Sequence, residues 1–475
     1  MKKLVLCAVV ILFAGCKNVD KLSVKEMRAD LFILWSAIKE LHPGYGIYTS
    51  TDSLAKSYNA VYSSLNEPLY ESEFTARIYP FLCALGCGHT QIEHSKNHKS
   101  PESVHLPFEV LVHQHRAWVT TSKTDKLAAG DEVISINGEP VSAIIEHGNA
   151  LYCGDGYVES FKELFLSEYD GFEDACSKYY HWKAPYRLTI STSAKVLKDV
   201  VLDSTNLQPV VGYENKYANW TKADSGEDCQ LYFSKKGGTA LFEVNGLAYS
   251  DTTSYQQCFD KVARQGIKNL ILDMRHNGGG DLRIAIKLLS YLTDSSFGIV
   301  KDIKSRIPNP AKNHFSSYFD SARTESFNGS CLPSYQEGAW YHMDINPDFA
   351  RIYAPLAVAG AGRFRGRLFV LIDGATFSSA ALFTSALKAQ RKDVVFIGRE
   401  TAGTEEGCNG FAMQKLTLPN TGISVVFPWL RVVSMAKSPV FGRGLMPDYP
   451  VAYTAEDVVR GRDLDLERAG GVIGF

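Results

Sequence analysis

Three stretches of the sequence carry residue types that could perform nucleophilic catalysis. The first, Gly374-Ala-Thr-Phe-Ser-Ser-Ala-Ala381, holds Ser378 directly after an apolar run. The second is Asp273-Met-Arg-His-Asn-Gly-Gly-Gly280, and the third is Gly88-His-Thr90. A serine hydroxyl becomes a strong nucleophile only when a neighbouring base takes its proton, and histidine is the side chain best suited to that task near neutral pH. Backbone amides of a glycine-rich turn can stabilise the negative charge that develops on the attacked oxygen.

The first two stretches each follow a predicted buried strand. Strands are expected at residues 239–244, 270–274 and 368–372, and they alternate with helices near 254–265 and 282–292. This alternation predicts a layered α/β domain. Ser378 should therefore lie at or near a helix N-terminus, where unpaired N–H groups favour a developing oxyanion. Taken alone, a serine at such a position is equally consistent with a simple helix cap.

Two further units precede this domain. Leu31, Leu34, Trp35, Ile38 and Leu41 recur at helical spacing, and amphipathic stretches follow at 51–65 and 71–85, so residues 28–100 are expected to form a helical unit. Residues 105–205 change to short Val-rich strands and contain Leu127 to Val141, which resembles the centre of a PDZ domain. That resemblance implies a groove for an extended peptide, although a β-rich spacer without a ligand fits the same pattern. The catalytic unit is expected at 225–460, with an insertion at about 293–360.

The motifs taken in order resemble the S41 peptidases, the family of C-terminal processing and tricorn-type proteases. The match runs from Gly88-His-Thr90 through the PDZ-like segment and the glycine turn to Thr376-Phe-Ser-Ser379. The resemblance implies a multidomain α/β protein whose catalytic domain has a ClpP/crotonase-like fold. It also implies that Ser378 is the nucleophile. The backbone amide of Ser379 would supply one oxyanion donor, and that of Gly278 or Gly279 the other.

The choice of general base depends on a difference between this sequence and the processing proteases of the family. Processing proteases use a lysine roughly 25 residues after the serine, but Gly403 stands in that region here. Tricorn-like members use a histidine from the N-terminal part, which matches His89. No acid precedes the turn Gly444-Leu-Met-Pro-Asp448, where the family places a glutamate. Glu405 or Glu406 is the candidate acid that orients His89, and a solvated loop charge is the alternative for either. A buried structural histidine is the alternative role for His89.

The N-terminus predicts export. Lys2 and Lys3 precede an apolar run, residues 4–14, that is too short to span a bilayer. Leu12-Phe-Ala-Gly-Cys16 resembles a bacterial lipobox, which implies a signal peptide at 1–15, a lipidated Cys16 and a tether at 16–27. The protein is then expected in the bacterial cell envelope, anchored by lipid on a periplasmic or outer-membrane surface. An ordinary signal peptide with an incidental cysteine is the alternative.

Composition limits the partners. The chain has 50 Lys and Arg against 52 Asp and Glu, so no basic face is predicted and nucleic acid is not an expected partner. Eight cysteines remain beyond Cys16, and the export context permits either disulfides or buried thiols. Cys83-Ala-Leu-Gly-Cys87 is not a zinc pattern by itself, because no second ligand pair lies at a suitable spacing, so neither a metal nor another cofactor is expected. The expected function is a serine endopeptidase acting on extracytoplasmic proteins or peptides, and the alternatives are an inactive S41-like peptide-binding lipoprotein and a crotonase-like acyl-CoA enzyme.

Overall fold

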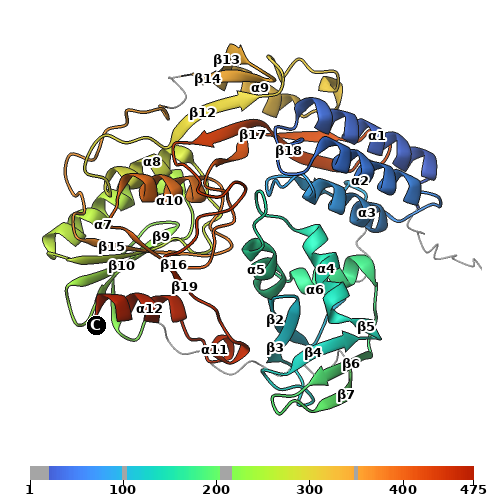
Figure 1. Cartoon of the computed structure of the whole chain (residues 1–475), viewed down its shortest axis with the longest axis horizontal. Coiled ribbons are helices and arrows are strands. Elements are labelled where there is room, and N and C mark those ends of the chain that lie inside the picture. The colour runs from blue at the N-terminus through green and yellow to red at the C-terminus, as the bar shows by residue number, and fades with distance from the viewer. Residues whose placement is uncertain (1–20, 99–103, 204–216, 347–350, 475) are drawn as a thin grey trace, which may run out of the picture.

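A computed structural model describes residues 21–98, 104–203, 217–346 and 351–474 of the chain. Three sheets and the helices around them make up these residues, as Figure 1 shows. The expected multidomain α/β class is confirmed. The proposed signal peptide and Cys16 lie outside the described residues. Within the described residues, no helix combines the length and apolar character needed to cross a membrane.

The N-terminal helices, at the upper right of Figure 1, carry the residues that lead to Gly88-His-Thr90. Their bounds are α1 Val24–Leu41, α2 Thr51–Ser64 and α3 Glu71–Cys83. A capping box of Ser23 and Glu26 begins α1, whose helix-spaced apolar residues are buried. The helix ends at Leu41, directly before His42-Pro43, because proline disfavours the helical conformation of the residue before it.

The small sheet and its helices form a second unit. The strands are β2 Phe108–His113, β3 Arg116–Ser122, β4 Glu132–Ile136, β5 Glu139–Pro140, β6 Tyr186–Ser191 and β7 Leu197–Leu202. The helices are α4 Val141–Leu151, α5 Ser160–Glu168 and α6 Gly171–Tyr179. All strand pairs are antiparallel, and β2 is an edge strand. Helix α5 lies against that edge, where Ser167 Oγ accepts a 2.8 Å hydrogen bond from the Val112 amide. The PDZ-like character of this unit stays a prediction.

The seven-stranded sheet lies at the left of Figure 1 and supports two of the three motifs. Its order is β19-β16-β15-β11-β10-β9-β8, and the strands from β10 to β19 are parallel. The bounds are β8 Trp220–Ser225, β9 Cys229–Ser234, β10 Thr239–Val244, β11 Asn269–Asp273, β15 Arg367–Ile372, β16 Val395–Gly398 and β19 Tyr449–Pro450. The carboxyl ends of parallel strands meet at one edge, so the turns after β11 and β15 lie next to each other.

Helices cover both faces of this sheet. The covering helices are α7 Thr252–Arg264, α8 Leu282–Ser290, α10 Ser379–Gln390 and α12 Leu464–Ile473, while η1 Tyr249–Asp251 and α11 Ala455–Val459 are short connecting helices. Alternate strand residues face opposite cores: Phe242 and Leu272 pack with α7 and α8, and Leu241 and Ile271 pack on the α12 side. Burial on both faces explains why these strands read as continuous apolar runs.

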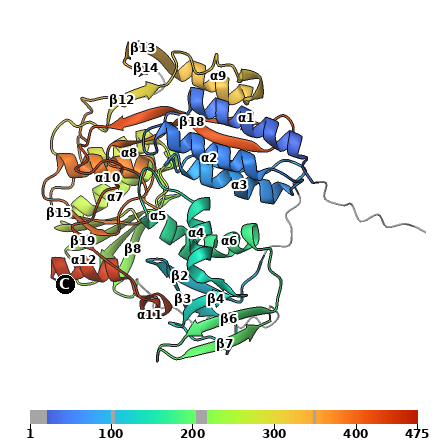
Figure 2. The same cartoon turned by 45° about the vertical axis from the view of Figure 1, so that its right-hand side comes forward.

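A third sheet joins the N-terminal helices to the rest of the molecule. It consists of β1 Gln91–Glu93, β12 Val300–Ser305, β13 Cys331–Glu337, β14 Trp340–Ile345, β17 Gly407–Thr417 and β18 Ser424–Ser434, with η2 Ser316–Tyr318 and α9 Ser321–Ser330 beside it. Both views place this sheet beside α1, and Figure 2 shows β18 passing behind the N-terminal helices. The segment expected as an irregular insertion therefore supplies three strands, which pair with one another and with β18.

Candidate active site

Ser378 and His89 lie in hydrogen-bond contact although 289 residues separate them in sequence. The distance between Ser378 Oγ and His89 Nε2 is 2.9 Å. Ser378 directly precedes α10, and His89 lies between α3 and β1. The histidine reaches the serine because β1 pairs with β18 and so fixes the loop that precedes it. This is the geometry of a nucleophile with its general base.

The backbone at Ser378 is strained, with φ 54° and ψ −127°. A non-glycine residue with positive φ is uncommon and costs of order 1–3 kcal/mol when its conformation is sparsely populated. The side chain of Ser378 makes no capping hydrogen bond to α10, so the simple helix-cap role is wrong. The buried Asp373 carboxylate holds the turn by accepting hydrogen bonds from the Ala375 and Thr376 amides at 2.9 and 3.0 Å.

The glycine turn after β11 packs directly on this serine turn. The Phe377 amide donates a 2.9 Å hydrogen bond to the Asn277 carbonyl. Gly279 has φ +98°, and a Cβ there would lie 2.8 Å from Ser378 Cβ, so only glycine fits. The Gly279 amide already donates to Asn277 Oδ1 at 2.9 Å, which leaves Gly278 as the better of the two expected oxyanion donors. Ser379, the other expected donor, begins α10.

His89 is half-buried against Phe377, whose ring centroid lies 4.4 Å away. Loss of solvation lowers the pKa of His89 to about 4, so the imidazole is neutral at neutral pH and can accept a proton. Among the described residues, its Nδ1 atom is buried and has no hydrogen-bond partner. The neighbouring Thr90 is fixed by a 2.8 Å hydrogen bond between its hydroxyl and His42 Nε2.

Neither glutamate expected to orient His89 bonds to it. Glu406 Oε1 instead accepts a 2.9 Å hydrogen bond from the Gly442 amide, and it also lies 3.4 Å from the Tyr48 hydroxyl. Glu405 is buried, and its backbone amide is bound by the Arg443 carbonyl. A carboxylate oxygen of Asp155, from the loop between α4 and α5, lies within 4.8 Å of a ring nitrogen of His89. The sequence did not single out this residue. The pattern Gly154-Asp-Gly156, an acid between two glycines, was the available signal.

Gly403, in the region where processing proteases of the family carry a lysine, packs closely against Ala381 and the Ser378 backbone. A Cβ at Gly403 would lie 2.6 Å from Ala381 Cβ and 3.5 Å from the Ser378 amide nitrogen. Contacts below 3.0 Å force neighbouring atoms to move. A longer side chain at position 403 is therefore incompatible with this arrangement of the serine turn, in agreement with a histidine as base.

Two groups of side chains in the described residues combine metal-binding atom types. In one group, Glu71, His94 and His98, the histidine rings stack 3.7 Å apart and 6° from parallel, so a shared ion would lie out of both ring planes. The other group is Cys87, His89 and Asp155. Burial raises the pKa of the Cys87 thiol, which favours its protonated, non-ligating form. No disulfide joins any of the eight described cysteines, so of the two alternatives that the sequence left open the structure has thiols.

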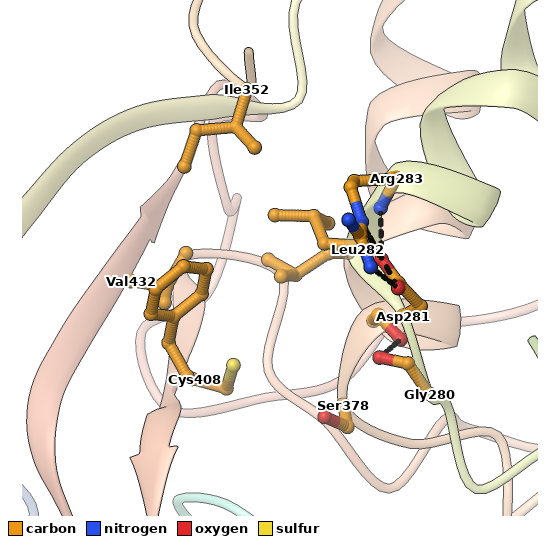
Figure 3. Close-up of a pocket in the computed structure, with 11 residues that line it drawn as sticks. Gly280, Asp281, Leu282, Arg283, Ile352, Ser378, Cys408 and Val432 are labelled. Carbon is orange, nitrogen blue, oxygen red and sulfur yellow. Dashed lines mark hydrogen bonds and ion pairs between the residues drawn. The ribbon is translucent and has the colours of Figure 1, made fainter. Parts of the chain in front are cut away.

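An apolar cavity opens beside Ser378, shown in Figure 3. Its volume is about 200 Å³. Ser378 and Cys408 lie at one end, while Leu282 and Ile352 face each other across the space in the figure. Phe411, Leu382 and Val432 complete its apolar wall. The Asp281–Arg283 ion pair lies at the side, so neither charge faces the cavity alone. A side chain that enters from a substrate bound at Ser378 would meet mostly hydrocarbon.

Comparison with known proteins agrees with this site. Residues 238–451 match the model of peptidase family S41, a span that holds the glycine turn and Ser378. The chain is similar in fold to mature CPAF complexed with lactacystin, with a TM-score of 0.66 at 15% identity over 95% of this chain and 98% of that chain. A structure of mature CPAF gives a TM-score of 0.64 at 14% identity over 95% and 97% of the two chains. No curated protein matches the sequence. Through residues 238–451 the chain belongs to peptidase family S41 and is a serine-type peptidase.

Proposed function

We propose that this protein is an endopeptidase that cleaves extracytoplasmic proteins or peptides through an acyl-enzyme on Ser378, with His89 as the general base. The observation that carries the proposal is the 2.9 Å contact between Ser378 Oγ and His89 Nε2. The neutral state of His89 and the exposed cavity beside the serine support the same chemistry.

The reaction proceeds in two acyl transfers. His89 takes the proton of Ser378, and the alkoxide attacks the peptide carbonyl while the Gly278 and Ser379 amides bind the oxyanion. The imidazolium then gives its proton to the leaving amine. A water molecule, deprotonated by His89, attacks the acyl-enzyme and releases the acid. The strained backbone of Ser378 fixes its Oγ toward His89 before substrate binds.

The cavity supports a preference for an apolar residue on the acyl side of the cut bond. Apolar side chains form a large part of its wall, and its two charged residues, Asp281 and Arg283, pair with each other. Burying a charged substrate side chain there without a partner would be costly. Peptides with Leu or Phe at that position should exceed otherwise identical peptides with Asp or Lys by at least about 10-fold in kcat/KM.

A serine-reactive phosphonate probe tests the proposed function. Covalent labelling of the wild-type protein that disappears in Ser378→Ala supports an enzyme. The competing function is an S41-like lipoprotein that binds peptides without turnover, which the absence of both the family lysine and an acid before Gly444 leaves open. Absence of labelling across the pH range, with retained peptide binding, would establish that alternative. Anchoring through Cys16 is tested separately, since Cys16→Ser should move the protein from the membrane fraction to the soluble fraction.

A further inference from the structure

Two buried polar atoms beside the catalytic pair are without hydrogen-bond partners among the described residues. They are Nδ1 of His89 and Oδ2 of Asp155. One ring nitrogen of His89 and one carboxylate oxygen of Asp155 lie within 4.8 Å of each other. Burying a polar atom without a hydrogen bond is costly, and native proteins rarely leave two such atoms side by side without a functional reason.

The loop between α4 and α5 is built to bring Asp155 to this place. Asp155 Oδ1 accepts a 3.0 Å hydrogen bond from the amide of Gly88, the residue before His89. The Asp155 amide donates to the Ala402 carbonyl at 2.9 Å, and the Gly156 amide donates to the Gly86 carbonyl at 2.9 Å. A Cβ at Gly156 would lie 2.4 Å from the Gly442 carbonyl oxygen, so the close approach requires glycine. Three segments distant in sequence, at residues 86–88, 402 and 442, therefore fix the position of the loop that carries Asp155.

We propose that Asp155 is the positioning residue for His89 and accepts a hydrogen bond from Nδ1–H, either directly or through one bridging water. The inference rests on the proposed function and completes it. With Nδ1–H directed at Asp155, Nε2 presents its lone pair to Ser378 Oγ. When Nε2 takes the serine proton, the imidazolium is stabilised by the Asp155 carboxylate, which itself stays ionised. Water-mediated contacts of this length are nearly as favourable as direct hydrogen bonds.

The charges that face Asp155 agree with this role. Burial raises its pKa to about 7, against the hydrogen bond from Gly88 and the charge of Arg431, which lower it. Glu406 is the acidic neighbour, and its charge acts to raise the pKa. Tyr48, Cys87 and Cys408 have pKa values raised by burial. A hydrogen bond with Cys83 raises the pKa of Cys153, so all four neighbours are neutral at pH 7. Asp155 is thus the carboxylate best placed to respond to a charge that forms on His89.

The pH dependence of kcat distinguishes a positioning role from a structural one. In the wild type, kcat should fall as the pH drops below about 7, because a protonated Asp155 no longer stabilises the imidazolium. Asp155→Asn keeps the acceptor for the Gly88 amide and should lower kcat on the order of 100-fold. Its remaining activity should lose the decline near pH 7 and persist toward the pKa of His89, about 4. An Asp155→Asn enzyme with an unchanged pH profile, or with kcat within about threefold of wild type, would overturn the proposal.

Glu405→Gln provides the comparison, since it removes a buried carboxyl from the same region without approaching His89. In Glu405→Gln, kcat should still decline as the pH falls below about 7. If this decline were lost in Glu405→Gln but kept in Asp155→Asn, the positioning role would belong to Glu405. A second readout does not need turnover. The Cε1–H signal of His89, identified by its loss in His89→Gln, is titrated in Ser378→Ala with and without Asp155→Asn. Different curves support the contact even if the phosphonate labels nothing, and identical curves sink the inference even if Ser378 is reactive.

Discussion

Nε2 of His276 donates a 2.6 Å hydrogen bond to Glu168, and this contact joins the second unit to the glycine turn. Glu168 is the last residue of α5, while His276 lies between the strand β11 and the glycines that face Ser378. The other ring nitrogen lies 3.1 Å from the buried Asp373 carboxylate, which organises the serine turn. With a carboxylate at each nitrogen, His276 is held in its doubly protonated form. One histidine thus connects α5 to both turns of the site.

The Glu168–His276 pair should make stability depend on pH. The hydrogen bond from His276 to Glu168 is the largest cause that raises the histidine pKa. A raised folded-state pKa means that the stabilisation is complete below the unfolded value, about 6.5, and is lost as the pH rises through the folded value. Glu168→Gln should therefore lower the free energy of unfolding more at pH 6 than at pH 9, by less than about 1 kcal/mol because the pair is partly exposed. Thermal unfolding at the two pH values measures the difference. An equal loss at both pH values would contradict the assignment.

Glu163→Gln is the matched control for that variant. Glu163 also lies in α5 and pairs with a histidine, His113, at 2.9 Å, but on the side of the small sheet. Both variants are expected to change stability slightly. Only Glu168→Gln should also reduce kcat/KM, by several-fold, because it releases the residue next to Asn277. Equal effects of the two variants on turnover would show that the contact does not position the glycine turn.

Ser378→Ala and His89→Ala should each abolish most peptide cleavage, and the double variant should be scarcely worse than either. The two side chains form one activated nucleophile, so removing either partner removes the same function. Initial rates with an apolar peptide substrate measure the three variants, and unchanged thermal unfolding shows that they fold. Losses that multiply in the double variant would mean that the residues act independently, and His89 would then not be the base.

Gly403→Ala should destabilise the protein by about 1–3 kcal/mol, because the added Cβ would lie 2.6 Å from Ala381 Cβ inside a packed core. Removing the opposing methyl group in the double variant Gly403→Ala, Ala381→Gly should recover much of this loss, apart from about 1 kcal/mol for glycine in a helix. Urea unfolding measures both. If the losses of unfolding free energy caused by Ala381→Gly and Gly403→Ala simply added up in the double variant, the contact between the two Cβ atoms would not be the cause of the destabilisation.

Arg275→Ala should destabilise the fold by about 3–5 kcal/mol. The buried guanidinium binds Asp273, Asp463 and Asp465, and so ties the glycine turn to the start of α12. Its removal takes the shared cationic partner away from these three carboxylates. Arg283→Ala, which breaks the partly exposed pair with Asp281, is the comparison and should cost less than about 1 kcal/mol. Equal losses in urea unfolding would mean that burial of the Arg275 network contributes little.

The sequence alone determined the parts of the site that local patterns encode. An apolar strand, a glycine turn and a helix start place Ser378 and Gly278 at the edge of a parallel sheet, and β10 has the predicted bounds 239–244. The residue type and the order of the motifs along the chain, which resembles that of the S41 family, then identified His89. The reason is physical: the periodicity of buried residues and the conformational needs of glycine act over a few residues, and they are visible in a short window of sequence.

Tertiary structure decided which acid lies near His89. Glu405 and Glu406 looked suitable because they lie near Gly403 in sequence, yet Glu406 is bound by Tyr48 and Gly442 instead. Asp155 reaches the histidine loop through hydrogen bonds to Gly88 and Ala402, and the spacing of residues in the sequence does not predict these contacts. The strands of the insertion were missed for the same reason. Strand β12 joins the other two strands to β18, and β18 lies more than a hundred residues further along the chain. Strand pairing and buried polar contacts between distant segments depend on how the whole chain packs, and only the folded molecule shows them.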